Sequence, residues 1–301
     1  MASIKVADSI VEALAAGKPV VALESTIFTH GLPRPRNYEV AIQGEEAIRA
    51  LGAIPATIGV YKGVPTVGLS PEQIKELSED DDVFKASIRD LALGVVSKKN
   101  GGTTIAATTF LAYKAGIKVF ATGGLGGVHH GASENFDESA DLVALAKYPI
   151  VLVSSGAKAV LDIHATLERF ETLSVPVVGY QTNNYPGFYV TDSGFKLGNR
   201  VDSPEEVATI YNVMRDMGLS EAICVGNPVP EDEQLDPKGL DVVIEKAWQA
   251  LEDQKVEGQA VTPFLLEFIR QETKDASLDA NVALYFNNAR LAAKIATALV
   301  S

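Results

Sequence analysis

The chain has little cysteine, little basic charge and no apolar run long enough to span a bilayer. Its one cysteine among 301 residues excludes an intrachain disulfide and a cysteine-rich zinc site, as expected in a reducing compartment. With 26 basic and 39 acidic residues, the formal charge of −13 argues against a broad basic face for nucleic acid. Because no signal-peptide core is present either, the sequence predicts a cytoplasmic protein that binds neither nucleic acid nor membrane.

Short apolar runs typical of strands alternate with amphipathic helical stretches along most of the chain. This alternation predicts a three-layer α/β/α fold, in which helices cover both faces of a largely parallel or mixed central sheet. No linker rich in proline, glycine or charge interrupts the chain, so we expect residues 1–301 to form a single domain. Strands are predicted at Val20–Leu23, Ala56–Val60, Thr66–Leu69, Lys118–Ala121, Ile150–Val153, Val175–Gly179 and Ala222–Val225.

Helix boundaries are marked by capping residues. Ser70 and Ser203 each precede Pro-Glu and then a Gln or Glu, which is the pattern of an N-cap, a first-turn proline and a capping partner. Gly116 follows a helical stretch where a left-handed C-cap is expected. The apolar stretch Leu278–Val300 is predicted to pack on the body of the protein. Amides within that stretch need hydrogen-bond partners if they are buried, namely Asn281, Asn287 and Asn288.

The strand Val20–Leu23 ends in a lone acid, Glu24, followed by two hydroxyl residues. In open α/β sheets, ligands bind outside the carboxyl ends of the strands, so Glu24 would project into a crevice. The alternative is a strand end that simply reaches water. Glu24 is therefore a candidate catalytic acid.

A lysine, Lys158, follows the strand Ile150–Val153 through a Ser-Ser-Gly turn. With Ser155 as N-cap, Lys158 is predicted in the first turn of a helix over Ala157–Asp162, where the helix dipole disfavours an ammonium ion. A neutral amine can attack an aldehyde carbon, so this placement predicts Schiff-base chemistry. The alternative is a solvated surface lysine.

Two glycine-rich segments precede or follow predicted elements. Asn100–Thr104 reads Asn-Gly-Gly-Thr-Thr and precedes a helix over Ile105–Ala115, where backbone N–H groups and threonine hydroxyls would suit a phosphate. A flexible turn with a threonine N-cap explains the same pattern without a ligand. Thr122–Gly131 has four glycines within the five positions 123–127, which would let the backbone approach a ligand closely, and we interpret its His129 as a polar site residue.

Acidic and basic side chains gather in two further segments. Phe136–Asp141 places three carboxylates near the start of a helix. Acidic side chains interact favourably with the positive end of a helix dipole, so a functional role is not needed to account for them. Asp137 and Asp141 are also spaced to share a helix face, and carboxylate oxygens suit magnesium or manganese. Basic and small residues alternate through Lys85–Asp90, which indicates an extended segment. Its residues Lys85, Ser87 and Arg89 would then lie on one side and could face an anion. An ordinary surface strand has the same pattern.

Together these segments resemble the pseudouridine-5′-phosphate glycosidase family, also called the indigoidine synthase A-like family. The resemblance covers nearly the whole chain, and the order and spacing of the motifs make it specific. The motifs are Val21–Ile27, Lys85–Leu91, Asn100–Thr104, Thr122–His129, Phe136–Asp141, Ser155–Lys158, Thr262–Leu266 and Asn281–Asn288.

The resemblance implies a homotrimeric α/β/α enzyme that reversibly cleaves the C–C glycosidic bond of pseudouridine 5′-phosphate to uracil and ribose 5-phosphate. It implies a divalent metal, Mn²⁺, with Asp137 as its ligand. Lys158 would be the nucleophile on the ring-opened ribose and Glu24 the proton donor. Substrate contacts would come from Lys85, Thr104, Ile105, Thr122, His129, Ser139, Ala140, Asp141 and Asn281.

The chemistry of a C–C glycosidic bond fits these residues. Such a bond has no heteroatom leaving group to protonate, so the usual pair of carboxylates suits it poorly and a lysine adduct suits it better. One alternative is a glycosidase for a related sugar phosphate or modified nucleotide. The other is a sugar-phosphate-binding protein without activity, which would need neither Lys158 nor Glu24.

Overall fold

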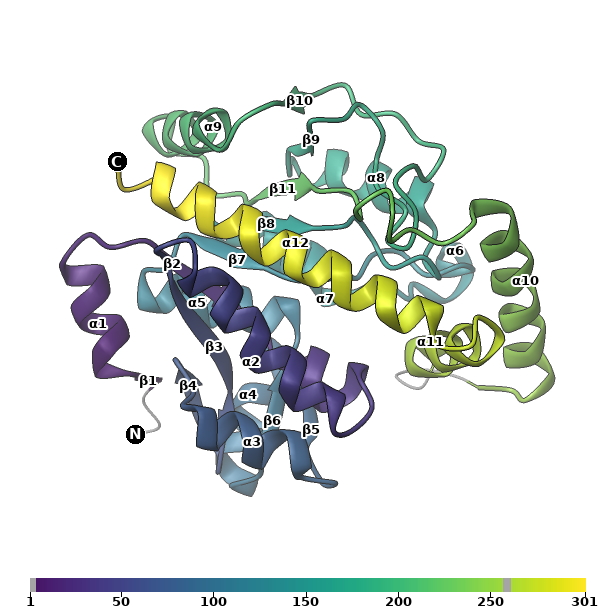
Figure 1. The fold of residues 1–301 in the computed structure, drawn as a ribbon, viewed down its shortest axis with the longest axis horizontal. Coiled ribbons are helices and arrows are strands. Elements are labelled where there is room, and N and C mark those ends of the chain that lie inside the picture. The colour runs from purple at the N-terminus through teal and green to yellow at the C-terminus, as the bar shows by residue number, and fades with distance from the viewer. Residues whose placement is uncertain (1–3, 257–260) are drawn as a thin grey trace.

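A single mixed sheet covered by helices on both faces forms the centre of the computed structural model (Figure 1), which describes residues 4–256 and 261–301. The first three residues, part of the segment in which a signal peptide was sought, lie outside the described residues. The strands are β1 (Lys5–Val6), β2 (Val20–Leu23), β3 (Ile54–Tyr61), β4 (Val64–Val67), β5 (Phe84–Ala86), β6 (Gly101–Thr103), β7 (Val119–Ala121), β8 (Val151–Ser154), β9 (Val177–Tyr180), β10 (Arg200–Val201) and β11 (Ile223–Gly226).

Helices connect nearly all of these strands. They are α1 (Asp8–Ala15), the π-helical turn η1 (Ile27–Gly31), α2 (Arg36–Arg49), α3 (Pro71–Glu79), α4 (Ile88–Ser97), α5 (Ile105–Ala115), α6 (Ala132–Asn135), α7 (Ala140–Lys147), α8 (Ile163–Thr172), α9 (Pro204–Asp216), α10 (Pro237–Asp253), α11 (Val261–Glu272) and α12 (Ala276–Ala298). No helix among the described residues is both long and apolar enough to cross a membrane.

The strands follow the order β1-β4-β3-β2-β7-β8-β11-β9-β10, with β6 paired to β3 and β5 to β6. All pairs are parallel except those of β3 with β4 and with β6, so the predicted largely parallel or mixed sheet is confirmed. All seven predicted strands are present. β5 overlaps the segment Lys85–Asp90, for which a surface strand was one interpretation, whereas β1, β6 and β10 were not predicted.

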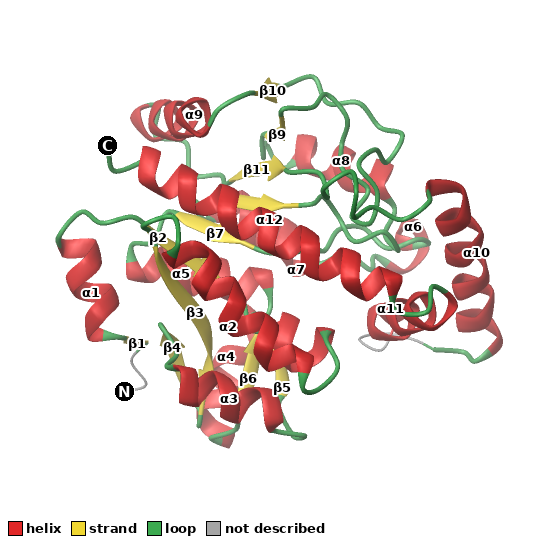
Figure 2. Cartoon of the chain, in the orientation of Figure 1, coloured by secondary structure: helices red, strands yellow, loops and turns green. Residues whose placement is uncertain are grey.

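The helices form two layers, one on each face of the sheet (Figure 2). On one face α12 crosses β2, β7 and β8, with α2 and α9 packed beside it. On the other face α5 packs under β2 and β3 and contacts α4 and α7, and α7 contacts α8. The predicted three-layer α/β/α architecture is therefore confirmed.

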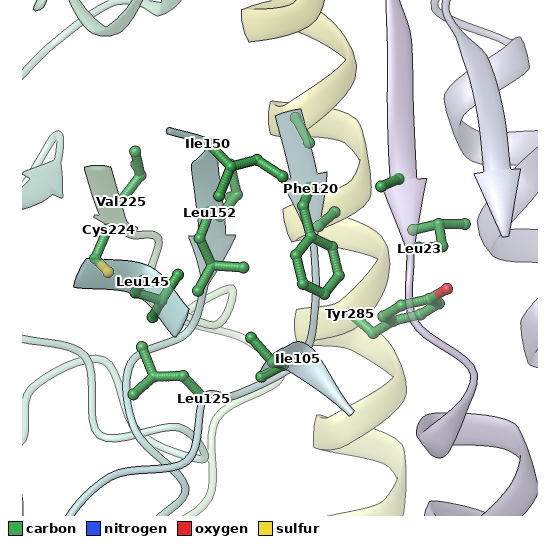
Figure 3. Packing of buried hydrophobic residues seen from close by; sticks show 14 of the residues in the cluster. Leu23, Ile105, Phe120, Leu125, Leu145, Ile150, Leu152, Cys224, Val225 and Tyr285 are labelled. Atoms are coloured by element: carbon green, nitrogen blue, oxygen red, sulfur yellow. The ribbon is translucent and has the colours of Figure 1, made fainter. Parts of the chain in front are cut away.

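The core lies between the central strands and these helices. β2, β7, β8 and β11 are buried along their whole length, as expected of parallel strands covered on both faces. Figure 3 shows Leu23 of β2 and Phe120 of β7 in this core, with Tyr285 of α12 beside Leu23. Cys224 lies buried in β11, and burial raises the pKa of its thiol.

The predicted helix boundaries are also found. Ser70 accepts a hydrogen bond from the Gln73 N–H at 3.3 Å, and Ser203 accepts one from the Glu206 N–H at 3.2 Å. Gly116 ends α5 in the left-handed conformation, with φ of 86°. The long apolar segment at the C-terminus is the helix α12, which packs on the body as predicted.

The helices α10 and α11 pack on each other, and α11 contacts α12 (Figure 1). Trp248 of α10 meets the ring of His130 edge to face, with ring centroids 5.1 Å apart. His130 itself is exposed, and it belongs to the glycine-rich loop after β7. The α10 helix therefore packs against the loop that also contains His129.

Candidate active site

A cavity of about 710 Å³ lies where the loops that follow β2, β7 and β8 come together. This is the edge of the sheet formed by the carboxyl ends of parallel strands, where α/β proteins bind ligands. Most of the predicted site residues line it, namely Glu24, Lys85, Thr104, Ile105, His129, Asp137, Ser139, Ala140, Asp141 and Lys158. A second cavity of about 420 Å³, between α8 and residues 195–199, contains none of them.

Glu24 follows β2 directly, and its side chain is only 7% exposed. The Thr122 hydroxyl donates to Oε1 and the Thr26 hydroxyl donates to Oε2, so both carboxyl oxygens have a partner. Burial raises the pKa of Glu24, and the nearby Asp141 raises it further, while Lys158 and the two hydroxyls act in the opposite direction. Glu24 is thus a buried acid that keeps its proton to higher pH than an ordinary glutamate.

Lys158 lines the cavity from a loop and not from a helix, which corrects the prediction. Its backbone N–H donates to the Leu125 carbonyl at 3.0 Å, and Ala157 forms a parallel bridge with Leu125. The helix α8 begins only at Ile163, with Asp162 as its N-cap. The proposed influence of a helix dipole on Lys158 is therefore wrong, and contact with the loop after β7 fixes its position.

The turn before Lys158 has its own structural requirements. Ser155 is not an N-cap, because its hydroxyl donates to the Asn227 carbonyl at 2.9 Å. Gly156 adopts φ of 82° and lies so close to the Pro186 carbonyl that a Cβ atom would clash with it. This crowding turns the chain away from a helical path and toward Leu125.

Lys85 lies on β5, a short strand that pairs with β6. The extended pattern predicted through Asp90 ends early, because Ser87 is the N-cap of α4 and the Asp90 carboxylate accepts the Ser87 N–H at 3.0 Å. Lys85, Ser87 and Arg89 nevertheless all line the cavity. Burial, and then the charge of Lys158, lower the pKa of the Lys85 ammonium.

The Asp141 carboxylate joins two elements of the cavity wall. One oxygen accepts the Ala106 N–H at 2.8 Å, at the N-terminus of α5, and the other accepts the Gly126 N–H at 2.9 Å. A Cβ atom at Gly126 would collide with the side chains of Ser139 and Asp141. Glycine is therefore needed here to make room for these two side chains, and not primarily for a ligand. Part of the anion-binding capacity predicted for the start of α5 is therefore already used by Asp141.

The two candidate metal ligands do not share a helix face, which corrects a second prediction. Asp137 lies in the loop before α7, whose N-cap is Ser139, and Asp141 is in the first turn. Residues 4–256 and 261–301 contain no group of three or more side chains arranged to hold a metal ion. Asp137 and Glu138 both line the cavity from this loop, but the Glu138 carboxylate accepts a hydrogen bond from Arg169 at 2.8 Å. A cation held by Asp137 would therefore be largely hydrated.

His129 is close to Asp137 in the cavity wall, and its backbone N–H donates to the Asp137 carbonyl at 3.0 Å. Burial lowers the pKa of the His129 imidazole, Asp137 opposes that effect, and Lys158 adds to it. Its buried Nδ1 atom lacks a hydrogen-bond partner within the described structure. His129 lines the cavity, as the sequence predicted for a polar site residue, but its Nδ1 atom is turned away from the open space.

The remaining predicted residues take different positions. Thr104 caps α5, where its hydroxyl accepts the Ala107 N–H at 3.4 Å, and both Thr104 and Ile105 face the cavity. Thr122 is not among the lining residues, because it has no exposed surface and stands behind Glu24. Asn281 on α12 lies beside Gly123 and is likewise outside the lining.

One wall of the cavity, formed by the far half of α7, was not predicted from the sequence. Helix periodicity could have indicated part of this wall, because residues three, four and seven positions after Asp141 lie on the same side of the helix as Asp141. Ala144 and Tyr148, three and seven positions after Asp141, line the cavity as this spacing indicates. Val143 and Lys147 also line it, and this spacing does not predict them. Lys147 and Arg89 add exposed cations to the wall.

Comparisons with known proteins agree on one family. Residues 9–298 match the sequence model described as Indigoidine synthase A like protein. A pseudouridine-5′-phosphate glycosidase of Saccharopolyspora erythraea is 57% identical over 288 residues, which cover 96% of this chain and 95% of the relative. A protein of the same name from Salinispora tropica is 51% identical over 290 residues, covering 96% and 90%.

A solved structure has the same fold. It is the prealnumycin C-glycosynthase AlnA in complex with ribulose 5-phosphate, with a TM-score of 0.91 and 32% identity. The likeness covers 99% of this chain and 97% of the other. The resemblance drawn from the sequence motifs is therefore confirmed.

Proposed function

The chain belongs to the indigoidine synthase A-like family, and on this premise we propose that it is an enzyme that reversibly cleaves the C–C glycosidic bond of pseudouridine 5′-phosphate. The products of cleavage are uracil and ribose 5-phosphate. The observation that carries the proposal is that relatives with this name match nearly the whole chain, while Glu24 and Lys158 line the same cavity. A C-glycosynthase of the same fold, bound to a five-carbon sugar phosphate, adds support.

Lys158 is the nucleophile in this proposal. The C1′–O4′ bond of the furanose ring breaks and its electron pair stays on O4′, while the neutral Lys158 amine forms a bond to C1′. The proton that O4′ gains balances the one that the lysine nitrogen loses. The nitrogen lone pair then forms a C=N bond, and the electrons of the bond between C1′ and the uracil carbon leave with uracil. Water hydrolyses the resulting iminium ion, which releases ribose 5-phosphate and regenerates the amine.

Glu24 supplies the proton that uracil needs as it leaves. The departing carbon carries the electron pair of the broken bond, so an acid must protonate it, and in the reverse reaction the carboxylate removes that proton. Burial raises the pKa of Glu24, which keeps the acid form available. The Thr26 and Thr122 hydroxyls hold the carboxyl group in place.

The phosphate and ribose are assigned to the cations and hydroxyls of the cavity wall. Lys85 is the first phosphate partner, because its half-buried ammonium faces the cavity. Thr104 and Ile105 contribute the start of α5, and His129 contributes its imidazole ring to the cavity wall. The remaining ribose contacts, and help with ring opening, are assigned to Ser139, Ala140 and Asp141.

A divalent cation fits the donor atoms present only as a largely hydrated ion. Asp137 would hold it through a carboxylate oxygen, and Mn²⁺ or Mg²⁺ accepts one carboxylate with several waters. When bound, such an ion supplies positive charge for a phosphate or hydroxyl oxygen of the substrate. We expect a chelator to lower activity and added Mn²⁺ to restore it.

The proposal includes a homotrimer. Its basis is the family resemblance, together with exposed apolar side chains on α4, where Leu93 is 66% and Val96 is 82% exposed. Light scattering in solution tests it: a mass three times that of one chain is expected, and a monomer mass contradicts it.

The deciding experiment follows uracil release from pseudouridine 5′-phosphate in the presence of Mn²⁺. We expect release by the wild-type protein and by Lys114→Ala, a control for an exposed lysine outside the cavity, but none by Lys158→Ala. Borohydride should trap ribose 5-phosphate on Lys158. If folded wild-type protein releases no uracil with any divalent metal, the proposed function is wrong. Binding of ribose 5-phosphate without turnover would then favour a sugar-phosphate-binding protein, and turnover of another nucleotide a related glycosidase.

A further inference from the structure

Asn288 on α12 has a fully buried side-chain amide that lies against the backbone just after β7 and outside the cavity lining. Its Nδ2 donates to the Thr122 carbonyl at 2.8 Å and to the Gly123 carbonyl at 3.2 Å. Its Oδ1 accepts a hydrogen bond from Asn227 Nδ2 at 2.9 Å. One amide thus joins the central helix α12 to the chain just after β7 and just after β11.

The third contact of Asn288 reaches the end of β8. The single proton of the Ser155 hydroxyl is donated to the Asn227 carbonyl, at 2.9 Å. Ser155 Oγ, 3.2 Å from Asn288 Nδ2, therefore acts as an acceptor toward the amide. Both the donor and the acceptor atoms of Asn288 are satisfied, as a buried polar network requires.

This network ends at the proposed acid. Asn288 holds the backbone of Thr122, and the Thr122 hydroxyl donates to Glu24 Oε1. The chain of contacts from α12 to the reacting carboxyl group therefore contains one intervening residue. Asn288 also contacts Ser155, at the start of the turn that leads to Lys158, but the Lys158 backbone has an anchor of its own, because its N–H donates to the Leu125 carbonyl at 3.0 Å.

We propose that Asn288 is a positioning residue that acts through Thr122 to hold the Glu24 carboxyl group where it transfers a proton to the uracil carbon. The inference rests on the proposed function, because it needs Glu24 to be the acid. Asn288 does not line the cavity, so it touches neither substrate nor the reacting atoms. Its effect is expected on the proton-transfer step and not on formation of the lysine adduct.

The neighbouring residue provides a matched control. Asn287 lies on the same helix and donates to the Pro228 carbonyl at 3.0 Å, so it also anchors α12 to a loop through one backbone oxygen. Within the described residues, its side chain makes no hydrogen bond to Thr122 or Ser155. Asn287→Asp and Asn288→Asp therefore make the same chemical change one residue apart.

The first measurement compares the two variants in steady-state uracil release. The carboxylate of Asn288→Asp cannot donate to Thr122 and Gly123, so the backbone at residue 122 shifts. We expect kcat to fall about 100-fold, the typical cost of a misplaced catalytic group, with little change in KM. Asn287→Asp should keep wild-type kcat. Equal losses in both variants would mean that Asn288 has only a structural role.

The second measurement separates the two proposed catalytic groups. Borohydride trapping of ribose 5-phosphate on Lys158, followed by mass spectrometry, reports the adduct without a proton transfer to uracil. Asn288→Asp should trap ribose 5-phosphate nearly as fast as wild type. If trapping falls as much as kcat, Asn288 does not act selectively on Glu24 and the inference is wrong.

The third measurement tests the route through Thr122. Thr122→Val removes the hydroxyl that bonds Glu24 and leaves the side-chain shape. If Asn288 acts through that hydroxyl, Asn288→Asp should cost much less kcat in the Thr122→Val background than in wild type. Additive losses would contradict this route.

One further variant covers the case in which Asn288→Asp does not fold. Asn227→Asp keeps Asn288 but replaces the donor to its Oδ1 by a second acceptor, which misorients the amide. A lower kcat with retained trapping supports the inference, and wild-type kcat contradicts it. An inactive but folded wild-type protein would instead refute the proposed function, and the inference with it, so the two failures are distinguishable.

Discussion

At the scale of single residues, the cavity brings opposite charges together in a buried place. The charges of Lys158 and Asp141 act on Glu24, and the charges of Lys158, Asp141 and Glu24 act on Lys85. Burial disfavours ionisation of the glutamate more strongly than Lys158 favours it, so the pKa of Glu24 is raised. Ionisation of Glu24 in this buried place therefore lowers the free energy of unfolding.

The first prediction concerns Glu24→Gln and pH. Between the ordinary glutamate pKa of 4.5 and the raised value, the folded wild type binds more protons than the unfolded chain. Its free energy of unfolding therefore falls as pH rises through this window, by at most about 1.4 kcal/mol for each unit of pKa shift. Glu24→Gln cannot ionise there, so we expect it to gain stability relative to wild type as pH rises.

Urea unfolding at a series of pH values measures this difference. Cleavage of pseudouridine 5′-phosphate should also fall as pH rises through the raised pKa of Glu24, because the acid form is lost. A stability difference between the two proteins that is the same at every pH would argue against the raised pKa.

At the scale of elements, the short turn after β8 decides where Lys158 lies. Gly156 has positive φ and no room for a Cβ atom beside the Pro186 carbonyl. We expect Gly156→Ala to destabilise the protein by at least about 1–2 kcal/mol, the cost of a left-handed residue with a side chain. Because Lys158 is two residues on, the rate of borohydride trapping should fall as well.

Gly116→Ala is the comparison for this variant. Gly116 also has positive φ, but a Cβ atom added there would have no neighbour within 4 Å, and Gly116 is remote from Lys158 in the chain. The substitution should cost stability and leave the trapping rate unchanged. Equal trapping in Gly156→Ala and wild type would show that the turn does not position the lysine.

The elements also explain which sequence predictions succeeded. Continuous Val, Ile and Leu runs and clear caps identified the central strands and the start of α3, because burial and local capping determine them. The strand β6 was missed because Gly101 and Gly102 carry no strand signal and extend only through pairing with β3 and β5.

The misplaced helix at Lys158 has a similar cause. The apolar spacing of residues 157–162 is typical of a helix, but contacts with Leu125 and crowding at Gly156 override it. The site residues themselves were found through motifs. Their hydrogen bonds, such as those of Asp141 to two backbone N–H groups from separate segments, depend on tertiary structure that no local pattern contains.

At the scale of the whole molecule, net charge and ligand charge have the same sign. The formal charge of −13 repels a phosphate dianion at long range, so the cations in the cavity wall must attract it at short range. Lys147 is one of these cations and is exposed. Binding of ribose 5-phosphate should therefore weaken with salt, because the Debye length is about 10 Å at 0.1 M.

The third prediction is that Lys147→Gln weakens binding of ribose 5-phosphate about fivefold or less at low ionic strength, the range for an exposed charge pair. The loss should shrink at high salt. Lys114→Gln removes the same charge, but Lys114 lies outside the cavity lining, so this substitution should weaken binding less. Calorimetric titration gives both affinities, and identical losses would mean that only total charge matters.

The edge-to-face contact of Trp248 with His130 has an optical consequence. The chain contains one tryptophan, so its intrinsic indole emission comes from a single known place. That place is where α10 touches the loop that carries His129 into the cavity. A ligand that shifts this loop changes the surroundings of the indole ring, and the protein then reports its own occupancy as a change in fluorescence, without a label.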